Sequence, residues 1–454
     1  MRRTIRLLAV GALASSVVVA LPAGADGHVE TVLTGVDNGR GITFDDAGNL
    51  YVASAGTGGA GPCLPAPEGE GETCYGDTGQ IHRLPAGMVD ATPEDAENHI
   101  LVDALPSLAP QEGDFAMGDA MGPADVSVGA DMRLYFTIGL GANPAVRDMP
   151  PAEGGIDGAG QEDLMASLHS VVALDGTDLM KEEDLGDFEA TDPDGGGPDS
   201  NPFGVLADTA NDLVTVADSG GNTVVAVDLN GGDPAALAVL PPTFVPAPPF
   251  LGAPQGTNIP AQAVPTQHAV VGDTIHLGQL TGFPFAPGAA GVWAVDGDGA
   301  TPAYAGFTNI MDVAEGPDGS LLVLEVSHDG LLNAGDAPPM GALVRVTVDG
   351  DTVTRELLAD DLLMPGGMAV HPTDGHVYMT LGSAMPAAAP IPGAGQVVRM
   401  DLSTAEPLVT VVDDAASTEE DHRLVAGDGD EDQFTKVVDD VADNDTGVDT
   451  VTPL

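Results

Sequence analysis

Basic residues are scarce in this chain of 454 residues. Lys and Arg together number 13 against 70 Asp and Glu, which gives a formal net charge of −57 at pH 7. Nucleic acid and anionic membrane surfaces need a cationic binding surface, so neither is an expected partner. We interpret most of the acid as a solvated surface that maintains solubility. Calcium capture by part of it is the sharper alternative.

Aromatic residues and helical patterns are also rare. Phe, Trp and Tyr make up 4% of the chain. Beyond the N-terminal segment, no stretch of ten or more residues keeps a period of 3.6 residues, which excludes a helical solenoid. In their place are 61 Gly and 37 Pro in a chain that is 43% hydrophobic. This composition is typical of many short strands joined by tight turns.

The N-terminal residues 1–25 have the three parts of a secretory signal peptide. Basic residues come first, an apolar run follows at 7–21, and Ala23-Gly24-Ala25 provides a small-residue cleavage site. The run is too short for a comfortable membrane span, and no second long apolar segment follows, so membrane insertion is not expected. We expect cleavage after Ala25 and a secreted, extracellular protein.

Cysteine is limited to Cys63 and Cys74, which lie in a Gly- and Pro-rich insert. Their spacing is not CxxC, and no second pair exists to complete a zinc site, so metal and redox roles are disfavoured. In an oxidising compartment, two such cysteines are expected to form a disulfide that restrains one long loop.

One pattern recurs six times: a loop rich in Pro, Gly or Asn, a short apolar strand, a turn with Asp, Gly or Asn, and further apolar strands. The shorter spacings between copies fit a four-stranded propeller blade, and the longer ones carry inserts at 56–78, 140–163 and 241–260. The sequence therefore predicts an all-β, six-bladed β-propeller of four-stranded antiparallel blades. Its inner strands are expected to start at Ile42, Val126, Val205, His268, Val313 and Met368.

An outer strand usually precedes each loop of the repeat. By that rule, residues 30–33 complete blade six, so that the N-terminal strand closes the ring and removes a free sheet edge. Residues 408–411 compete for the same edge. Beyond about residue 413 the chain is acidic with few large apolar residues. The expected division is a signal peptide at 1–25, the propeller at 26–412 and a largely disordered acidic tail at 413–454.

The inner strands of a propeller converge on its axis, so residues at their starts meet although they are distant in sequence. These positions nominate a candidate axial cluster of Arg40, Asp125, Gln267, His268 and Asp312. The carboxylates, amide and imidazole could hold a hard cation such as calcium, with Asp125 and Asp312 as metal ligands. Alternatively, a carboxylate could act as a general base while Arg40 faces an anion. The plainer alternative is that these groups bind only water and satisfy strand ends.

The repeat resembles the NHL and TolB-like six-bladed propellers, and four segments are more specific. The segments 35–41, 61–76 with both cysteines, 280–285 (LTGFPF) and 306–312 together resemble the ScyD/ScyE family of secreted bacterial proteins. The resemblance covers nearly all of the mature chain before the acidic tail. It implies an exported propeller rather than a defined reaction. Two positions depart from the pattern: Gly39 stands where the repeat favours Pro, and Gln279 stands where an acid is expected.

No P-loop, GxSxG or HExxH motif is present. The leading hypothesis is a non-catalytic secreted propeller that binds a small molecule, a glycan or a secreted protein on its ring face. The alternative is a calcium-dependent hydrolase of the lactonase type with an axial metal site, which rests on analogy of fold. A part in the synthesis of a secreted aromatic pigment rests on the name of the resembled family alone.

Overall fold

A computed structural model describes residues 29–66, 71–89, 93–110, 120–333, 337–350, 352–389, 391, 393–405, 407–414 and 450–453. The expected signal peptide at 1–25 lies outside these ranges. Within them, no helix is long and apolar enough to cross a membrane.

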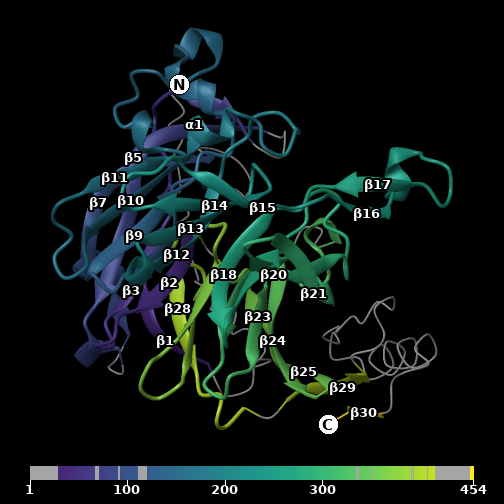
Figure 1. The fold of residues 1–454 in the computed structure, drawn as a ribbon. Helices are drawn as coiled ribbons and strands as arrows, with labels where there is room; N and C mark the ends of the chain where they lie inside the picture. Colours follow the sequence, from purple (N-terminus) through teal and green to yellow (C-terminus); the bar gives the residue numbers. More distant parts are fainter. Residues whose placement is uncertain are drawn as a thin grey trace, which may run out of the picture.

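The described residues form six antiparallel blades around one axis, which confirms the predicted propeller (Figure 1). Each blade has four strands, the first of them innermost. Blades one to three are β2 (Gly39–Phe44), β3 (Leu50–Ser54), β5 (Glu72–Leu84) and β7 (Ile100–Pro110); β8 (Pro123–Val128), β9 (Arg133–Ile138), β10 (Ser167–Val172) and β11 (Met180–Asp184); and β12 (Pro202–Asp208), β13 (Leu213–Asp218), β14 (Thr223–Asp228) and β15 (Ala235–Val239). Blades four to six are β18 (Pro265–Val271), β19 (Thr274–Gln279), β20 (Ala290–Asp296) and β21 (Gly299–Phe307); β22 (Ile310–Glu315), β23 (Leu321–Glu325), β24 (Met340–Asp349) and β25 (Thr352–Leu363); and β26 (Gly367–Val370), β27 (Val377–Leu381), β28 (Gln396–Met400) and β1 (Val29–Thr34).

Helices are short and lie in the connections. Within the described ranges the only α-helix is α1 (Leu185–Glu189). The 3-10 turns are η1 (Ala86–Met88), η2 (Ala96–Asn98), η3 (Pro144–Asp148), η4 (Pro151–Glu153), η5 (Glu162–Leu164), η6 (Thr209–Asn211), η7 (Pro249–Leu251) and η8 (Leu331–Asn333).

The N-terminal strand closes the ring, as the repeat predicted. β1 pairs antiparallel with β28, with Val29 opposite Met400 and Thr34 opposite Gln396. The short strand β6 (Glu94–Asp95) adds to the outer side of β1 in parallel. Joining the first strand to the last blade pairs the edge that an open ring would leave exposed.

The competing segment near residue 408 does not take part in closure. It forms β29 (Val409–Asp414), which pairs with β25 and adds a fifth strand to blade five. Because β1 already covers β28, the free edge of β25 is the one that remains. β29 runs past residue 412, and β30 (Thr450–Pro453) pairs with it. The rest of the expected acidic tail, 415–449 and 454, lies outside the described residues.

The core lies between neighbouring blades. Second strands such as β3 and β23 are buried along their whole length, because both of their faces pack against other sheets. Tyr51, Phe136 and Tyr378 are among the largest side chains with essentially no exposed surface. Continuous apolar runs of this kind are typical of strands buried on both faces.

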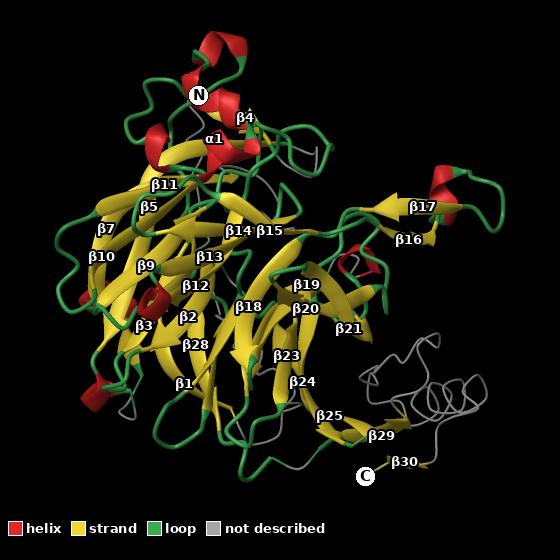
Figure 2. Cartoon of the chain, viewed as in Figure 1, coloured by secondary structure: helices red, strands yellow, loops and turns green. Residues whose placement is uncertain are grey.

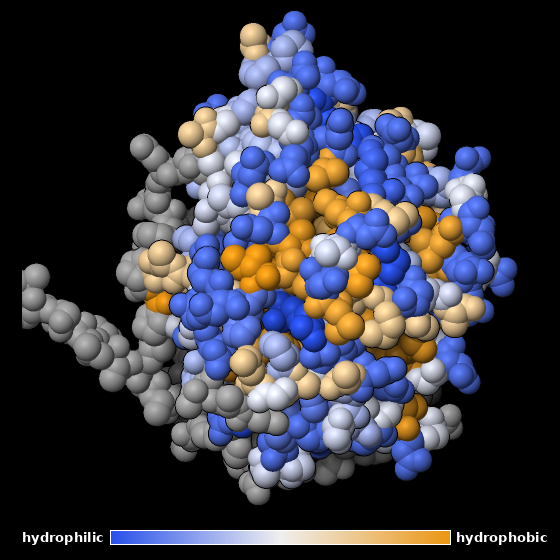
Figure 3. Space-filling model, turned by 90° about the vertical axis from the view of Figure 1, so that its left-hand side faces the viewer, coloured by the Kyte–Doolittle hydropathy of each residue, from blue (hydrophilic) through white to orange (hydrophobic). Residues whose placement is uncertain are grey.

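Each of the three predicted inserts adds short strands or 3-10 turns to the ring. In the first, β4 (Cys63–Pro65) pairs with β5, and the predicted disulfide joins Cys63 to Cys74 across this pair. The second contains η3, η4 and η5. The third forms a hairpin of β16 (Thr243–Pro246) and β17 (Asn258–Ala261), which projects away from the ring (Figure 2). Figure 3 shows a face that is mostly hydrophilic with apolar residues gathered near its middle, so the acidic composition does not produce a uniformly polar surface.

Candidate axial site

Three polar side chains and three glycines meet near the axis. They are the third residue of β2, β8, β12, β18 and β22 and the first residue of β26, so five inner strands begin three residues earlier than the sequence predicted. The glycines leave room for the polar groups: a Cβ on Gly41 would lie 1.9 Å from Asp125 Oδ1 and 2.8 Å from Gln267 Nε2. A Cβ on Gly204 would lie 2.6 Å from Gln267 Oε1. Separations this short exclude a side chain at either glycine unless the polar groups move. The axial centre is therefore filled by side chains from blades two, four and five.

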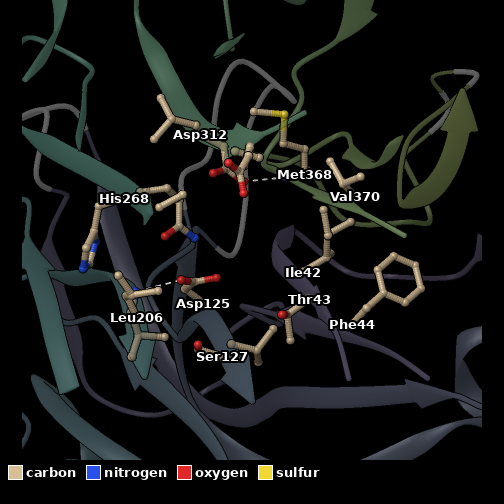
Figure 4. A pocket seen from close by; sticks show the side chains of 18 of the residues that line it. Ile42, Thr43, Phe44, Asp125, Ser127, Leu206, His268, Asp312, Met368 and Val370 are labelled. Atoms are coloured by element: carbon tan, nitrogen blue, oxygen red, sulfur yellow. Dashed lines mark hydrogen bonds between the residues drawn. The ribbon is translucent and has the colours of Figure 1, made fainter. Parts of the chain in front are cut away.

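Each axial carboxylate is fixed to the next blade around the ring. Asp125 Oδ2 accepts a hydrogen bond from the backbone N–H of Val205 at 2.7 Å, and Asp312 Oδ2 accepts one from Met368 N–H at 2.6 Å. The side chain of Gln267 also hydrogen-bonds to Asp125. Figure 4 shows both carboxylates directed into the space between the inner strands. These bonds link blade two to blade three and blade five to blade six.

Burial makes the charged forms of the two axial carboxylates energetically unfavourable. Asp125 and Asp312 are buried, and burial raises the pKa of Asp125 to about 7 despite its hydrogen bonds. Burial likewise raises the pKa of Asp312 well above 3.8, and the negative charge of Asp125 raises it further. Two buried like charges in one site favour a bound proton or a bound cation.

A cavity of about 290 Å³ extends from this pair along the inner strands (Figure 4). No Lys or Arg is among the described residues that line it. Its acidic lining residues are Asp45, Asp46, Asp125, Asp312 and Glu315. The carboxylate oxygens of Asp45 already accept hydrogen bonds within its own turn, from the backbone N–H and the side-chain amide of Asn49. The remaining acidic groups give the cavity a negative potential that favours cations.

The structure brings together three of the five predicted cluster residues, Asp125, Gln267 and Asp312. Arg40 is buried and does not line the cavity, because its Nη2 donates to the carbonyl of Ala120 at 2.8 Å. His268 is buried and does line the cavity, but its Nε2 lies 2.7 Å from Thr215 Oγ1 and its imidazole points away from the two carboxylates (Figure 4).

Strand alternation explains why Arg40 and His268 leave the cluster. Successive side chains of a strand point to opposite sides, and these two residues stand directly next to the axial positions 41 and 267. Burial lowers the pKa of His268 to about 4, so its imidazole is neutral at pH 7. Neither residue supplies a positive charge to the cavity.

The sequence reasoning missed polar residues further along the inner strands. Thr43 and Ser127 line the cavity two residues beyond Gly41 and Asp125. The same period of two would have found them, because residues i and i+2 of a strand share a face. Ser127 Oγ accepts a hydrogen bond from Ala207 N–H at 3.1 Å and so also joins blades two and three.

The axial donor set is small for a metal. Among the described residues, no group of three or more His, Cys, Asp and Glu side chains could hold a metal ion. Asp125, Asp312 and the amide oxygen of Gln267 offer hard oxygen donors. Calcium takes six to eight such ligands, so backbone carbonyls and water would have to complete its coordination.

No protein-family model matches the chain, and no curated protein matches it. Solved structures similar to it include a nidogen/laminin complex, at 12% identity over 78% of this chain and 92% of that chain, with a TM-score of 0.35. A luciferin-regenerating enzyme shares 8% identity over 84% of this chain and 96% of its own, with a TM-score of 0.38. A gluconolactonase from Xanthomonas campestris shares 12% identity over 65% and 85%, with a TM-score of 0.30. At these values the likeness carries no argument about function.

Proposed function

We propose that the protein is a secreted, ScyD/ScyE-like binding module whose axial cavity takes a small cationic ligand. The observation that supports this is the cavity's charge: two buried carboxylates stand at its inner end, and no described Lys or Arg lines it. A negatively charged cleft with low-dielectric walls concentrates cations and repels anions.

The energetics favour a cation over an empty acid pair. Each buried carboxylate loses hydration, and the two negative charges repel each other. The pKa values of Asp125 and Asp312 are raised for these reasons. A bound cation removes the repulsion and restores the ionised form of both groups. The cavity of about 290 Å³ is large enough for a metal ion with part of its water shell or for a small organic ammonium ion.

Export is the second part of the proposal. It rests on the signal-peptide pattern of residues 1–25 and on the Cys63–Cys74 disulfide, which is stable in an oxidising compartment. The resemblance of segments 35–41, 61–76, 280–285 and 306–312 to secreted ScyD/ScyE proteins supports the same localisation.

Isothermal titration of the mature full chain tests the axial site. Calcium, magnesium and tetramethylammonium are titrated separately into wild type and into the Asp125→Asn/Asp312→Asn double variant. We expect saturable binding of at least one cation to wild type, and the binding component assigned to the axial site should be at least about tenfold weaker in the double variant. Glu153→Gln, which removes an exposed acid on η4, is the control and should bind as wild type does. Equal binding by wild type and the double variant would refute the proposal.

A calcium-dependent hydrolase of the lactonase type is the second candidate. The observation in its favour is the position of Asp125, Asp312 and Gln267 together in the lining of the cavity, where their oxygens could act as calcium ligands. A lactone-hydrolysis assay with and without calcium, on wild type and Asp125→Asn, separates the two functions. Calcium-dependent turnover that Asp125→Asn abolishes would favour the hydrolase. Cation binding without turnover favours the binding module.

A further inference from the structure

A second acidic cluster lies outside the axial cavity, where α1 leads into the loop before blade three. Its members are Glu189 at the end of α1, Asp194 and Asp199 in the loop, and Asp218 at the end of β13. None of the four lines the axial cavity.

Glu189 is the unusual member of this cluster. Its side chain has 0% exposure, and its Oε2 has no hydrogen-bond partner among the described residues. Its Oε1 has one long contact, 3.5 Å from Asp199 N–H. A buried carboxylate oxygen without a donor is costly, and such oxygens are normally paired.

Asp218, by contrast, accepts hydrogen bonds from several protein donors. It accepts hydrogen bonds from Asn201 N–H at 2.6 Å, Ser200 Oγ at 2.7 Å, and the N–H groups of Gly220 and Gly221 at 3.1 Å each. These four donors favour its charged form, although burial still raises the pKa of Asp218 to about 6.

The unpartnered oxygen of Glu189 lies against the same turn. A Cβ on Gly221 would be 2.2 Å from Glu189 Oε2, and Gly221 N–H donates to Asp218 Oδ1. Two carboxylates therefore meet at one glycine, and only Asp218 receives donors there.

Among the ion pairs of the described residues, none joins a Lys, Arg or His to a member of this cluster. Burial raises the pKa of Glu189 to about 8, and the negative charges of Asp218, Asp194 and Asp192 raise it further. Burial and the negative charge of Asp194 also raise the pKa of Asp199.

Asp184, at the N-terminal end of α1, is an acid that has two basic partners. Arg147 Nη2 lies 3.0 Å from its Oδ1, and Lys181 Nζ lies 2.9 Å from its Oδ2. The pKa of Asp184 is lowered by these partners although burial acts against them. Basic side chains therefore pair with Asp184 at the start of α1, whereas no described basic side chain pairs with Glu189 at its end.

We propose that a hard divalent cation of the calcium class binds between Glu189 and the loop of residues 192–199, with Glu189 Oε2 as its buried ligand. The described residues contain no group of three His, Cys, Asp and Glu side chains that could hold a metal by themselves. The remaining ligands are therefore backbone carbonyls and water beside the carboxylates, a mixture that calcium accepts.

The position of the loop indicates what the cation would do. The loop runs directly into β12, the inner strand of blade three, and Ser200 forms a bridge with Ala142 of the second insert. A cation here would fix the loop against the start of blade three and so stabilise the folded ring. This site is independent of the axial proposal, because it shares no residue with the cavity.

The test is thermal unfolding of the mature full chain, freed of metal by chelation and titrated with calcium at fixed ionic strength. We expect calcium to raise the unfolding temperature of wild type and to raise that of Glu189→Gln by less, because only the axial cavity remains to bind calcium in that variant. Without calcium, Glu189→Gln should unfold at the wild-type temperature or above, because the substitution replaces a buried acid whose Oε2 has no hydrogen-bond partner among the described residues. A side chain with a merely structural role would instead lower the unfolding temperature with and without calcium.

Three further variants make the result specific. Glu153→Gln and the axial double variant Asp125→Asn/Asp312→Asn should each keep a calcium-dependent rise at this site. Asp194→Asn should reduce the rise and serves as the second cluster variant if Glu189→Gln does not fold. In a calcium titration, the binding component assigned to this site should be at least about tenfold weaker in the cluster variants than in wild type. The same calcium response in wild type, Glu189→Gln and Asp194→Asn would overturn the proposal, as would a response that only the axial variant removes.

Discussion

The axial carboxyl of Asp125 should make the stability of the ring depend on pH in a defined direction. Its pKa is raised from 3.8 to about 7 by burial in the folded chain. The folded state therefore holds the proton more tightly than the unfolded state does. The stabilisation that this proton gives is fully present below the unfolded pKa and is lost as pH rises toward 7. Asp125→Asn keeps the shape of the side chain and removes the titration.

The size of the effect follows from the shift. About three pKa units, at about 1.4 kcal/mol per unit, correspond to about 4 kcal/mol of unfolding free energy. The free energy of unfolding of wild type should therefore fall by about 4 kcal/mol relative to Asp125→Asn between about pH 4 and pH 8. Asp312 adds to the effect in the same direction, since its pKa is raised in part by the charge of Asp125.

Urea unfolding followed by circular dichroism, at a series of pH values and fixed ionic strength with a chelator present, measures this difference. The general repulsion of a chain with net charge −57 is nearly the same in both proteins and cancels in the comparison. Asp46→Asn, an exposed acid at the outer part of the cavity, is the matched control and should follow wild type. Parallel curves for wild type and Asp125→Asn across the whole range would refute the reasoning.

Three other predictions concern the scaffold. Gly41→Ala places a Cβ 1.9 Å from an axial carboxylate oxygen and should destabilise the ring by about 1–3 kcal/mol in urea unfolding, whereas Gly87→Ala meets nothing within 4 Å and should change little. Replacing Cys63 and Cys74 by serine opens a loop with a sequence separation of 11, which should cost about 3 kcal/mol and speed proteolysis within the insert; unchanged cleavage would contradict this. Deleting residues 29–34 exposes the edge of β28 and should cause aggregation on size-exclusion chromatography, and a stable monomer would show that closure by β1 is dispensable.

The ring was predictable because each blade repeats the same local chemistry. Gly, Asp and Asn mark the turns, and apolar runs mark the strands, so the six inner strands could be placed from sequence. The closing role of β1 followed from the order of strands within a repeat. The fate of residues 409–414 did not, because the edges of β25 and β28 offer similar pairing and only the folded ring shows which edge β1 has already taken.

The axial site was only partly predictable, since position in the repeat fixes where a residue lies but alternation fixes where its side chain points. Asp125, Gln267 and Asp312 share the axial register and meet there. Arg40 and His268 are one residue out of register and point between blades. The Glu189 cluster gave no sequence signal, because acids in a Gly-rich loop look like solvated surface until one of them proves to be buried.

The distribution of the few basic residues explains why these two sites stand apart from the rest of the acid. The described ion pairs with Arg join acids near strand edges and inserts: Arg133 with Asp178, Arg147 with Asp184, Arg345 with Glu356 and Arg399 with Glu30. Exposed acids elsewhere are hydrated, and salt screens their charge. A buried acid has neither, and one that lacks both a basic partner and enough hydrogen-bond donors is stabilised by taking a proton or a cation. In a chain this acidic, burial without a basic partner therefore distinguishes candidate cation sites better than the local density of acid does.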